Sequence, residues 1–154
     1  MKPIRVRTLK INEWTDGANV RAFVELERCC FEDAPWTEEM LTSVVDAAFR
    51  HIYVLSNEEF ILGYAIVQVI AGEGEVERIG IHPQYRGNSL GKQLLTGILQ
   101  SQALEECFLE VSATNQVAYG MYQACGFEEI GRRKAYYHDG SDAIMMKWKR
   151  TADE

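Results

Sequence analysis

The residues best suited to chemistry in this sequence form a loop of small and basic side chains. The loop is Arg86-Gly87-Asn88-Ser89-Leu90-Gly91-Lys92. Its glycines let the backbone approach a ligand closely, and the start of a helix offers unpaired N–H groups at the positive end of a dipole. The loop therefore predicts an anion site suited to phosphate. A glycine turn without a ligand explains the spacing equally well when the loop is taken alone.

Two common phosphate loops are excluded by spacing. Walker A has four residues between its glycines and a Ser or Thr after its lysine, but only three residues separate Gly87 from Gly91, and Gln93 follows Lys92. The dinucleotide fingerprint G-x-G-x-x-G is also absent from the sequence. The chain is therefore neither an ordinary nucleotide triphosphatase nor a Rossmann dehydrogenase.

The segments on both sides of the loop predict the elements that hold it. Val76–Ile81 is a strand before the loop, and Cys107–Val111 is a short buried strand after the helix. The helix between them is marked by an apolar face of Leu90, Leu94, Leu95, Ile98 and Leu99. Strand, helix and strand in this order predict a parallel pair with a right-handed crossover.

Other patterns complete an α/β fold with a mixed sheet. Further strands are predicted at Ile4–Leu9, His51–Ser56, Phe60–Ile70, Ile130–Tyr137 and Ala143–Trp148. Further helices are predicted at Val20–Phe31, after a cap at Thr37 followed by Glu38 and Glu39, and at Gln116–Cys125 before Gly126. Turns are predicted at Asn57-Glu58-Glu59, at Gly72 and Gly74, and at Asp139-Gly140.

Composition and net charge limit the kinds of partner that the chain is expected to bind. The 154 residues fit one domain, and a net charge of −7 argues against nucleic acid, which needs a basic surface. No apolar run approaches the ~20 residues of a membrane helix, and the N-terminus lacks the apolar core of a signal peptide, so we expect no membrane association and a cytoplasmic location. The four cysteines and three histidines lack metal-ligand spacing, so no metal is expected, and the cysteines are interpreted mostly as reduced core residues.

The loop closely resembles the acetyl-CoA signature of the GNAT superfamily, Q/R-x-x-G-x-G/A, read from Arg86 to Gly91. Ser89 stands at the middle glycine position of that signature. Serine is small and is expected to cap the helix that follows. The resemblance therefore implies that the loop binds the pyrophosphate of coenzyme A.

Downstream segments resemble the RimI-type enzymes, GNAT members that acetylate the N-terminal amine of a ribosomal protein. The matching segments are Pro35–Glu38, Ile79–Pro83, Leu109–Asn115, Ala118–Phe127 and Arg132–Met146. Their occurrence in chain order implies the GNAT fold. That fold is a mixed, mostly antiparallel twisted sheet of about six to seven strands, flanked by about four helices, with a parallel crossover at the cofactor site.

The same resemblance implies a role for each site residue. Glu110 corresponds to the general base that deprotonates the amine, and Tyr122 to the donor that protonates the leaving thiolate. Implied cofactor contacts are Ile79, Gly80, Ile81, Arg86, Gly87, Asn88, Ser89, Leu90, Gly91, Lys92, Asn115 and Tyr122. Without the resemblance, Glu110 is an ordinary outward-facing strand residue and Tyr122 an ordinary packing aromatic. Glu77 is the second candidate for the base.

The expected function is direct transfer of an acetyl group from acetyl-CoA, as co-substrate, to the N-terminal amine of a peptide or protein. A small amine, amino acid or polyamine is the alternative substrate. A non-catalytic acyl-CoA sensor is the alternative from another class, although pure binding requires neither Glu110 nor Tyr122. A single acetyltransferase domain over residues 1–154 is expected, as a monomer or homodimer.

Overall fold

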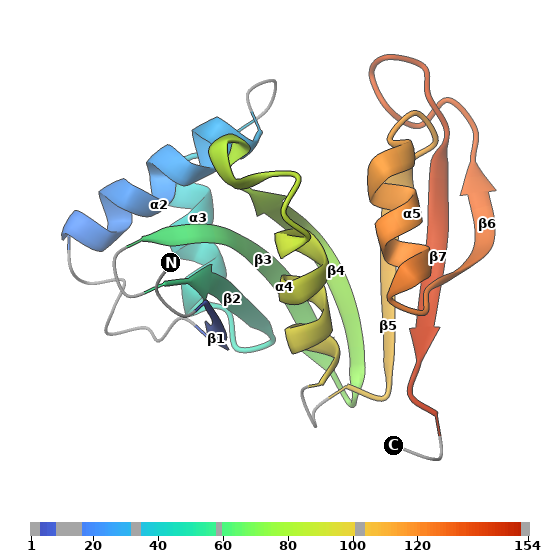
Figure 1. The fold of residues 1–154 in the computed structure, drawn as a ribbon, viewed down its shortest axis with the longest axis horizontal. Coiled ribbons are helices and arrows are strands. Elements are labelled where there is room, and N and C mark those ends of the chain that lie inside the picture. Colours follow the sequence, from blue (N-terminus) through green and yellow to red (C-terminus); the bar gives the residue numbers. More distant parts are fainter. Residues whose placement is uncertain (1–3, 9–16, 32–34, 58–59, 101–103, 152–154) are drawn as a thin grey trace.

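The computed structural model describes residues 4–8, 17–31, 35–57, 60–100 and 104–151. Within these residues, seven strands form one sheet in the order β1-β2-β3-β4-β5-β7-β6 (Figure 1). The strands are β1 (Arg5–Thr8), β2 (Arg50–Ser56), β3 (Ile61–Ile70), β4 (Glu73–Ile81), β5 (Glu106–Ser112), β6 (Glu128–Arg133) and β7 (Ala143–Lys149). The helices are α2 (Gly17–Cys30), α3 (Glu38–Asp46), α4 (Leu90–Leu99) and α5 (Gln116–Ala124), with a 3₁₀ turn at Pro83–Tyr85.

Three of the four described helices begin where the sequence predicts, whereas α2 begins at Gly17 rather than at Val20. Thr37 caps α3 by accepting a hydrogen bond from the Met40 N–H at 3.2 Å. Every member of the apolar face predicted after the loop is buried in α4. α5 is followed by Gly126, whose φ of +99° is a left-handed conformation that glycine adopts without strain.

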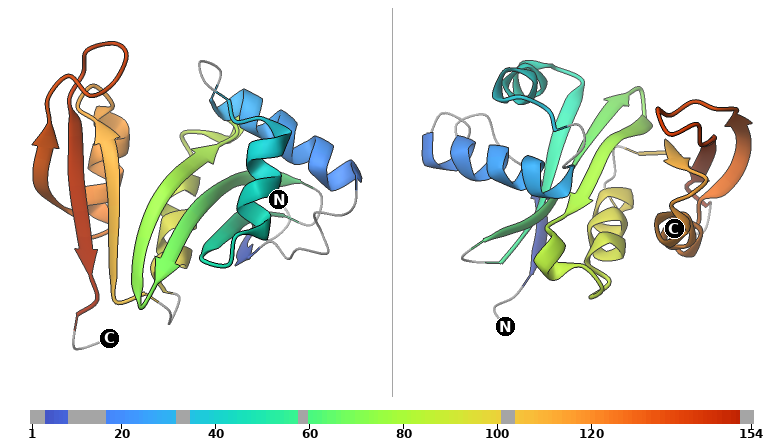
Figure 2. Two further views of the ribbon diagram at one scale, coloured as in Figure 1. Left: turned by 180° about the vertical axis from the view of Figure 1, so that it is seen from behind. Right: turned by 90° about the horizontal axis from the view of Figure 1, so that it is seen from above.

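Two apolar layers cover the two faces of the sheet. One layer contains α4 and α5, with buried residues that include Leu94, Ile98, Leu109, Val111 and Tyr122. The other contains α2 and α3, packed on β2 and β3, with buried residues that include Phe23, Leu26, Leu41, Val54 and Tyr64. Figure 2 shows α3 and α4 on opposite sides of the strands. We call these the α4/α5 face and the α2/α3 face.

β4 and β5 are the parallel pair, and they separate along their length. Their register covers only three pairs and ends with Glu75 opposite Phe108. Directly after this point β4 has a bulge. Val76 and Arg78 pair with the adjacent residues Val67 and Ile66 of β3, so Glu77 is the extra residue of the bulge. A bulge bends its strand. Figure 1 shows the result: β4 and β5 meet at one end and diverge toward the other.

The sheet confirms the predicted fold class, since every other strand pair is antiparallel. Two details of the prediction are wrong. Gly74 lies inside β4 rather than in a turn, because it pairs with Val69 of β3 and with Cys107 of β5. β6 ends at Arg133 rather than Tyr137, because the chain turns at Ala135, where φ is +48°.

Some predicted positions, including Leu9, Glu58 and Glu59, lie outside the described residues. No helix in the described part of the chain combines the length and hydropathy that a membrane span requires.

Candidate active site

The loop between β4 and α4 places a row of backbone donors at the start of a helix. Gly87 and Ser89 have φ of +85° and +59°, so the chain turns twice through left-handed backbone. The first helical bond runs from the Gln93 N–H to the Ser89 carbonyl at 3.1 Å. The N–H groups of Gly91 and Lys92 lie before Gln93, the first residue whose N–H donates within the helix, so they have no acceptor in α4. Such donors at the positive end of a helix suit a phosphate group.

Ser89 does not cap α4 as predicted. It occupies the N-cap position, but its side chain makes no capping hydrogen bond. A capping hydroxyl reaches the first-turn N–H groups from extended backbone, and the left-handed φ of Ser89 removes that geometry. The middle position of the motif thus takes the conformation natural to glycine, at a cost of ~1–2 kcal/mol for serine.

Two predicted loop residues hold the loop itself. Arg86 donates from Nε to the Ile81 carbonyl at 2.9 Å and from Nη2 to the Cys30 carbonyl at 3.4 Å. Asn88 donates from Nδ2 to the Tyr85 carbonyl at 3.2 Å. Arg86 therefore ties the loop to the ends of β4 and α2. Lys92 remains exposed on the first turn of α4.

The last residues of β4 present backbone donors toward β5. The His82 N–H donates to the Leu62 carbonyl at 2.8 Å, so at this position the chain bonds to β3. Alternate residues of a strand point their N–H groups to alternate sides, so those of Ile79 and Ile81 point away from β3. The β4–β5 register has ended before these residues. We call residues 79–81 the open edge of β4; Gly80, between the two donors, faces the end of α2.

Glu110 projects from the α2/α3 face of β5. Its neighbours Leu109 and Val111 are buried in the α4/α5 layer, and side chains alternate along a strand. The carboxylate accepts a hydrogen bond from the Arg133 Nε at 3.1 Å. Both partners are partly exposed, at 33% for Glu110 and 55% for Arg133, so solvent screens the pair.

Tyr122 lies on the opposite, α4/α5 face. Its side chain is 6% exposed and packs with its ring centroid 6.0 Å from that of Phe127. Burial raises the pKa of Tyr122 to about 12, helped by Tyr137 and Cys125. The pKa of Tyr137 is itself raised by burial first and then by Glu110, so Tyr137 is near both predicted catalytic groups. Glu110 and Tyr122 therefore lie on opposite faces of the sheet, and both interact electrostatically with Tyr137.

The remaining predicted residues have structural partners. Asn115 caps α5 through its Oδ1, which accepts from the Ala118 N–H at 3.2 Å, while its amide NH₂ group can still donate. Glu77, the second candidate base, is mostly buried at the bulge and pairs with the Arg50 Nε at 3.0 Å. Glu77 is thus held at the point where the strands only begin to diverge.

Glu27 is a buried charge that the sequence analysis missed. Its side chain is fully buried and forms an ion pair with the Arg78 Nε at 2.8 Å. Its place on α2 is the available signal: it lies at helical spacing among Phe23, Val24 and Cys30, so a carboxylate interrupts an apolar face.

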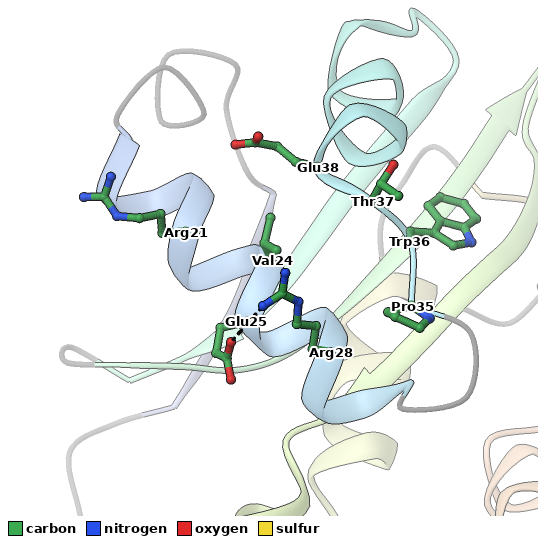
Figure 3. A pocket seen from close by; sticks show the side chains of 8 residues that line it. All are labelled: Arg21, Val24, Glu25, Arg28, Pro35, Trp36, Thr37 and Glu38. Carbon is green, nitrogen blue, oxygen red and sulfur yellow. Dashed lines mark ion pairs between the residues drawn. The ribbon is translucent and has the colours of Figure 1, made fainter.

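Three hollows lie on the described surface near these groups. One of about 640 Å³ opens beside the loop and is lined by Val6, Asn88, Ser89, Lys92, Gln93, Thr96, Gly97 and Gln100. A small one of about 90 Å³ is lined by Glu75, Phe108, Leu109, Glu110, Ile130, Met145 and Met146. The third, of about 560 Å³ between α2 and the start of α3, is lined by Arg21, Val24, Glu25, Arg28, Pro35, Trp36, Thr37 and Glu38 (Figure 3). Its wall carries two arginines and two glutamates, so its charge favours neither an anion nor a cation.

The four cysteines are free thiols. Cys107 is buried in the core, and Cys30 and Cys125 are partly buried against it, so the interpretation of most cysteines as reduced core residues is confirmed. Within the described ranges, no three His, Cys, Asp or Glu side chains gather closely enough to hold a metal ion.

Known proteins resemble this chain in sequence and in fold. The model of the acetyltransferase (GNAT) family matches residues 20–127. A [ribosomal protein bS18]-alanine N-acetyltransferase of Escherichia coli is 31% identical over 118 residues, 73% of this chain and 79% of that protein. The N-alpha-acetyltransferase RimI of Mycobacterium tuberculosis is 29% identical over 136 residues, 84% of this chain and 86% of that protein.

The structural comparison agrees. The crystal structure of the ribosomal-protein-S18-alanine N-acetyltransferase from Escherichia coli aligns with a TM-score of 0.80 and 26% identity, covering 96% of this chain and 94% of that chain. A NatC complex bound to Gag peptide and CoA aligns with a TM-score of 0.76 at 20% identity, covering 98% and 100%, and shares the fold. The chain therefore belongs to the acetyltransferase (GNAT) family and is an N-acetyltransferase related to the RimI type.

Proposed function

We propose that this enzyme transfers acetyl from acetyl-CoA directly to the N-terminal α-amine of a protein, such as a ribosomal protein. The observation that carries the proposal is the divergence of β4 from β5, with Glu110 and Tyr122 on opposite faces beside it. A passage between two strands lets a thioester and an amine meet from the two faces of one sheet. The relatives named for ribosomal-protein alanine support the choice of acceptor amine.

The residues present fit acetyl-CoA. The first-turn N–H groups at Gly91 and Lys92 suit its pyrophosphate, and the open edge of β4 suits the amide groups of its pantetheine arm. The NH₂ group of Asn115 is a further donor for that arm. Bound there, the cofactor supplies an acetyl thioester whose carbonyl carbon an amine can attack.

The side chains then divide the proton transfers. An α-amine has an ordinary pKa near ~7.7–8.0 and attacks only as the free base, so Glu110 accepts its proton, directly or through one water. The N–H groups of Ile79 and Ile81 donate hydrogen bonds to the carbonyl oxygen as negative charge develops on it. Tyr122 donates a proton to the departing sulfur. With a pKa of about 12, its hydroxyl is protonated at neutral pH.

The segment between β6 and β7 supports a peptide over a small amine. Asp142 fixes this segment by accepting a hydrogen bond from the Ala135 N–H at 3.0 Å. Tyr136 and Tyr137 stand with perpendicular rings, their centroids 5.3 Å apart. The Arg133 guanidinium lies 5.6 Å from the centre of the Tyr136 ring and also binds Glu110. An extended aromatic surface beside the base suits several residues of a peptide.

Mass spectrometry of acceptors incubated with acetyl-CoA tests the proposal. We expect an acetyl group on the α-amine of peptides with an N-terminal alanine, located by fragmentation. The same peptides with a blocked N-terminus and an internal lysine serve as the matched control and should remain unmodified. Acetylation of polyamines or free amino acids alone would contradict the peptide assignment. Tight binding of acetyl-CoA without transfer to any amine would contradict catalysis.

A further inference from the structure

A buried ion pair lies beside the open edge of β4 on the α2/α3 face. Glu27 on α2 is fully buried, and Arg78 on β4 is 15% exposed. Arg78 binds Glu27 with two nitrogens, Nε to Oε1 at 2.8 Å and Nη2 to Oε2 at 2.9 Å. The Tyr64 hydroxyl also donates to Oε1, and the backbone N–H of Trp36 donates to Oε2 at 2.7 Å. Both carboxylate oxygens are therefore fully engaged.

The guanidinium of Arg78 is also packed between aromatic rings. Its central carbon lies 3.8 Å from the centre of the Phe31 ring and 4.9 Å from that of Trp36. Phe31 directly follows α2, and Trp36 directly precedes the cap of α3, so the pair joins the ends of two helices to β4. A Cβ on Gly80 would lie only 3.0 Å from the Cys30 Cβ, which shows how closely α2 approaches the open edge.

A contribution to folding stability does not by itself explain why a buried ion pair is present here. Taking two charges out of water is costly, and apolar residues of similar volume often replace buried ion pairs without loss of stability. What an apolar pair cannot supply is direction, since two parallel N–H···O bonds fix both position and angle. The pair sits next to Ile79, one of the two residues whose N–H groups face β5.

We propose that Glu27 and Arg78 are a positioning pair, which holds Phe31 and Trp36 as a wall for the peptide against the open edge of β4. Glu110 projects from the same face of the sheet as this wall, so a peptide that reaches Glu110 passes beside it. This inference rests on the proposed function, because it assigns the pair to the peptide side of that same site. Neither residue touches the reacting atoms.

The test is a double variant, Glu27→Met with Arg78→Met, which removes both charges together and leaves neither one buried alone. We expect it to fold with a lower thermal midpoint than the wild type, because the Tyr64 hydroxyl and the Trp36 backbone N–H lose their acceptor. We expect the kcat/KM for peptide to fall by about 10-fold to 100-fold through a raised KM, because a displacement of about 1 Å suffices for such a loss. The KM for acetyl-CoA should change by less than about twofold, since the phosphate loop is intact.

Two further variants keep the test decisive. Arg78→Lys retains the charge but loses the paired hydrogen bonds and the stacking, so it should also raise the KM for peptide, even if the double variant fails to fold. Lys147→Met removes a charge from the partly exposed pair between Lys147 of β7 and Glu106 of β5, which contains neither Glu27 nor Arg78, and should leave both KM values unchanged. Hydrogen exchange at the Trp36 amide should accelerate in the double variant, because its acceptor is gone.

The outcomes separate the two proposals. Wild-type kinetics in a folded double variant, or in Arg78→Lys, would overturn the positioning role while the proposed function stands. An equal loss of affinity for acetyl-CoA and for peptide would also overturn it, because the pair would then support the fold in general. Absence of peptide acetylation by the wild type would remove both proposals.

Discussion

Glu110 and Tyr122 occupy opposite faces of the sheet, and their surroundings suit them to opposite proton transfers. Glu110 is partly exposed beside Arg133, where water or an amine can reach it. Tyr122 is buried, and burial raises its pKa to about 12, so its hydroxyl is protonated at neutral pH.

Replacement of Glu110 tests the assignment of the base. Glu110→Gln keeps the shape of the side chain but removes its basicity, so kcat should fall by about 10²–10⁴-fold. Glu77→Gln is the matched control, because Glu77 is the second candidate and is already held by Arg50 at 3.0 Å. Steady-state kinetics with peptide measure both. A larger loss in the Glu77 variant would reverse the assignment.

Tyr122→Phe should lower kcat by about 10²–10⁴-fold with little change in the KM for acetyl-CoA, because only the proton donor is removed. The hydroxyl is in its donating form below its pKa of about 12. In the wild type, kcat should therefore show no fall from tyrosine ionisation between about pH 8 and about pH 10. A decline of the wild-type rate in that range that Tyr122→Phe abolishes would show that the pKa of Tyr122 is much lower.

At the scale of elements, the β4–α4 loop shows why spacing predicts a site better than residue identity does. Ser89 stands where the signature has glycine, and the structure gives it the left-handed φ of +59°. The signature therefore specifies a backbone conformation, and serine adopts it under strain. The predicted cap is wrong because capping depends on the backbone φ of Ser89, which the identity of the side chain does not give.

Ser89→Gly should raise the free energy of unfolding by about 0.5–1 kcal/mol, since the relieved strain exceeds the added chain entropy of glycine. Acetyl-CoA affinity should stay within about threefold, because the N–H donors are unchanged. Denaturant unfolding and calorimetric titration measure the two. Asn88→Gly is the control: Asn88 is not among the positive-φ residues and bonds the Tyr85 carbonyl, so this change should destabilise. Severe loss of affinity in Ser89→Gly would show that the hydroxyl binds the cofactor.

The sequence predicts elements with a strong hydrophobic periodicity well, but it predicts the ends of several of them less well. The apolar face of α4 and the parallel crossover are predicted from hydrophobic patterns in the local sequence. The end of β6 depends on Asp142, seven residues beyond Ala135, whose side chain accepts from the Ala135 N–H and turns the chain. Gly74 lies in a strand because it pairs with Val69 and with Cys107, which is distant in sequence. Both corrections come from contacts that a local pattern does not contain.

At the scale of the molecule, the proposed site depends on the separation of β4 from β5 within one sheet. The bulge at Glu77 bends β4 where its pairing with β5 stops, which leaves the open edge beside Ile79 and Ile81. The order of motifs predicts which residues make up the proposed site. It does not predict that Glu110 and Tyr122 lie on different faces, or that Glu27 and Arg78 pair, because these depend on how separate elements pack.

Buried thiol and phenol groups predict how the whole fold responds to alkali. Burial raises the pKa of Cys107 from 9.0 to about 12, and that of Tyr122 from 10.0 to about 12. In the unfolded chain these groups ionise near their ordinary values, so the stability they contribute is complete below about pH 9 and is lost as the pH rises toward about 12. Each group lowers the unfolding free energy by about 1.4 kcal/mol per pH unit within its window.

Urea unfolding of the wild type and Cys107→Ala between about pH 8 and about pH 11 tests this linkage. The variant should be less stable at pH 8, because a buried side chain is truncated, but its stability should decline less steeply above about pH 9. Parallel declines in the two proteins would show that the Cys107 thiol does not resist ionisation in the fold.

The most direct test of the proposed catalytic arrangement is a crystal structure with a conjugate of coenzyme A and a peptide that has an N-terminal alanine. We predict that the pantetheine arm lies along Ile79 and Ile81, that the sulfur lies within hydrogen-bond reach of the Tyr122 hydroxyl, and that the peptide leaves the sheet on the face of Glu110. A conjugate whose peptide lies on the α4/α5 face, or whose sulfur is remote from Tyr122, would contradict the account.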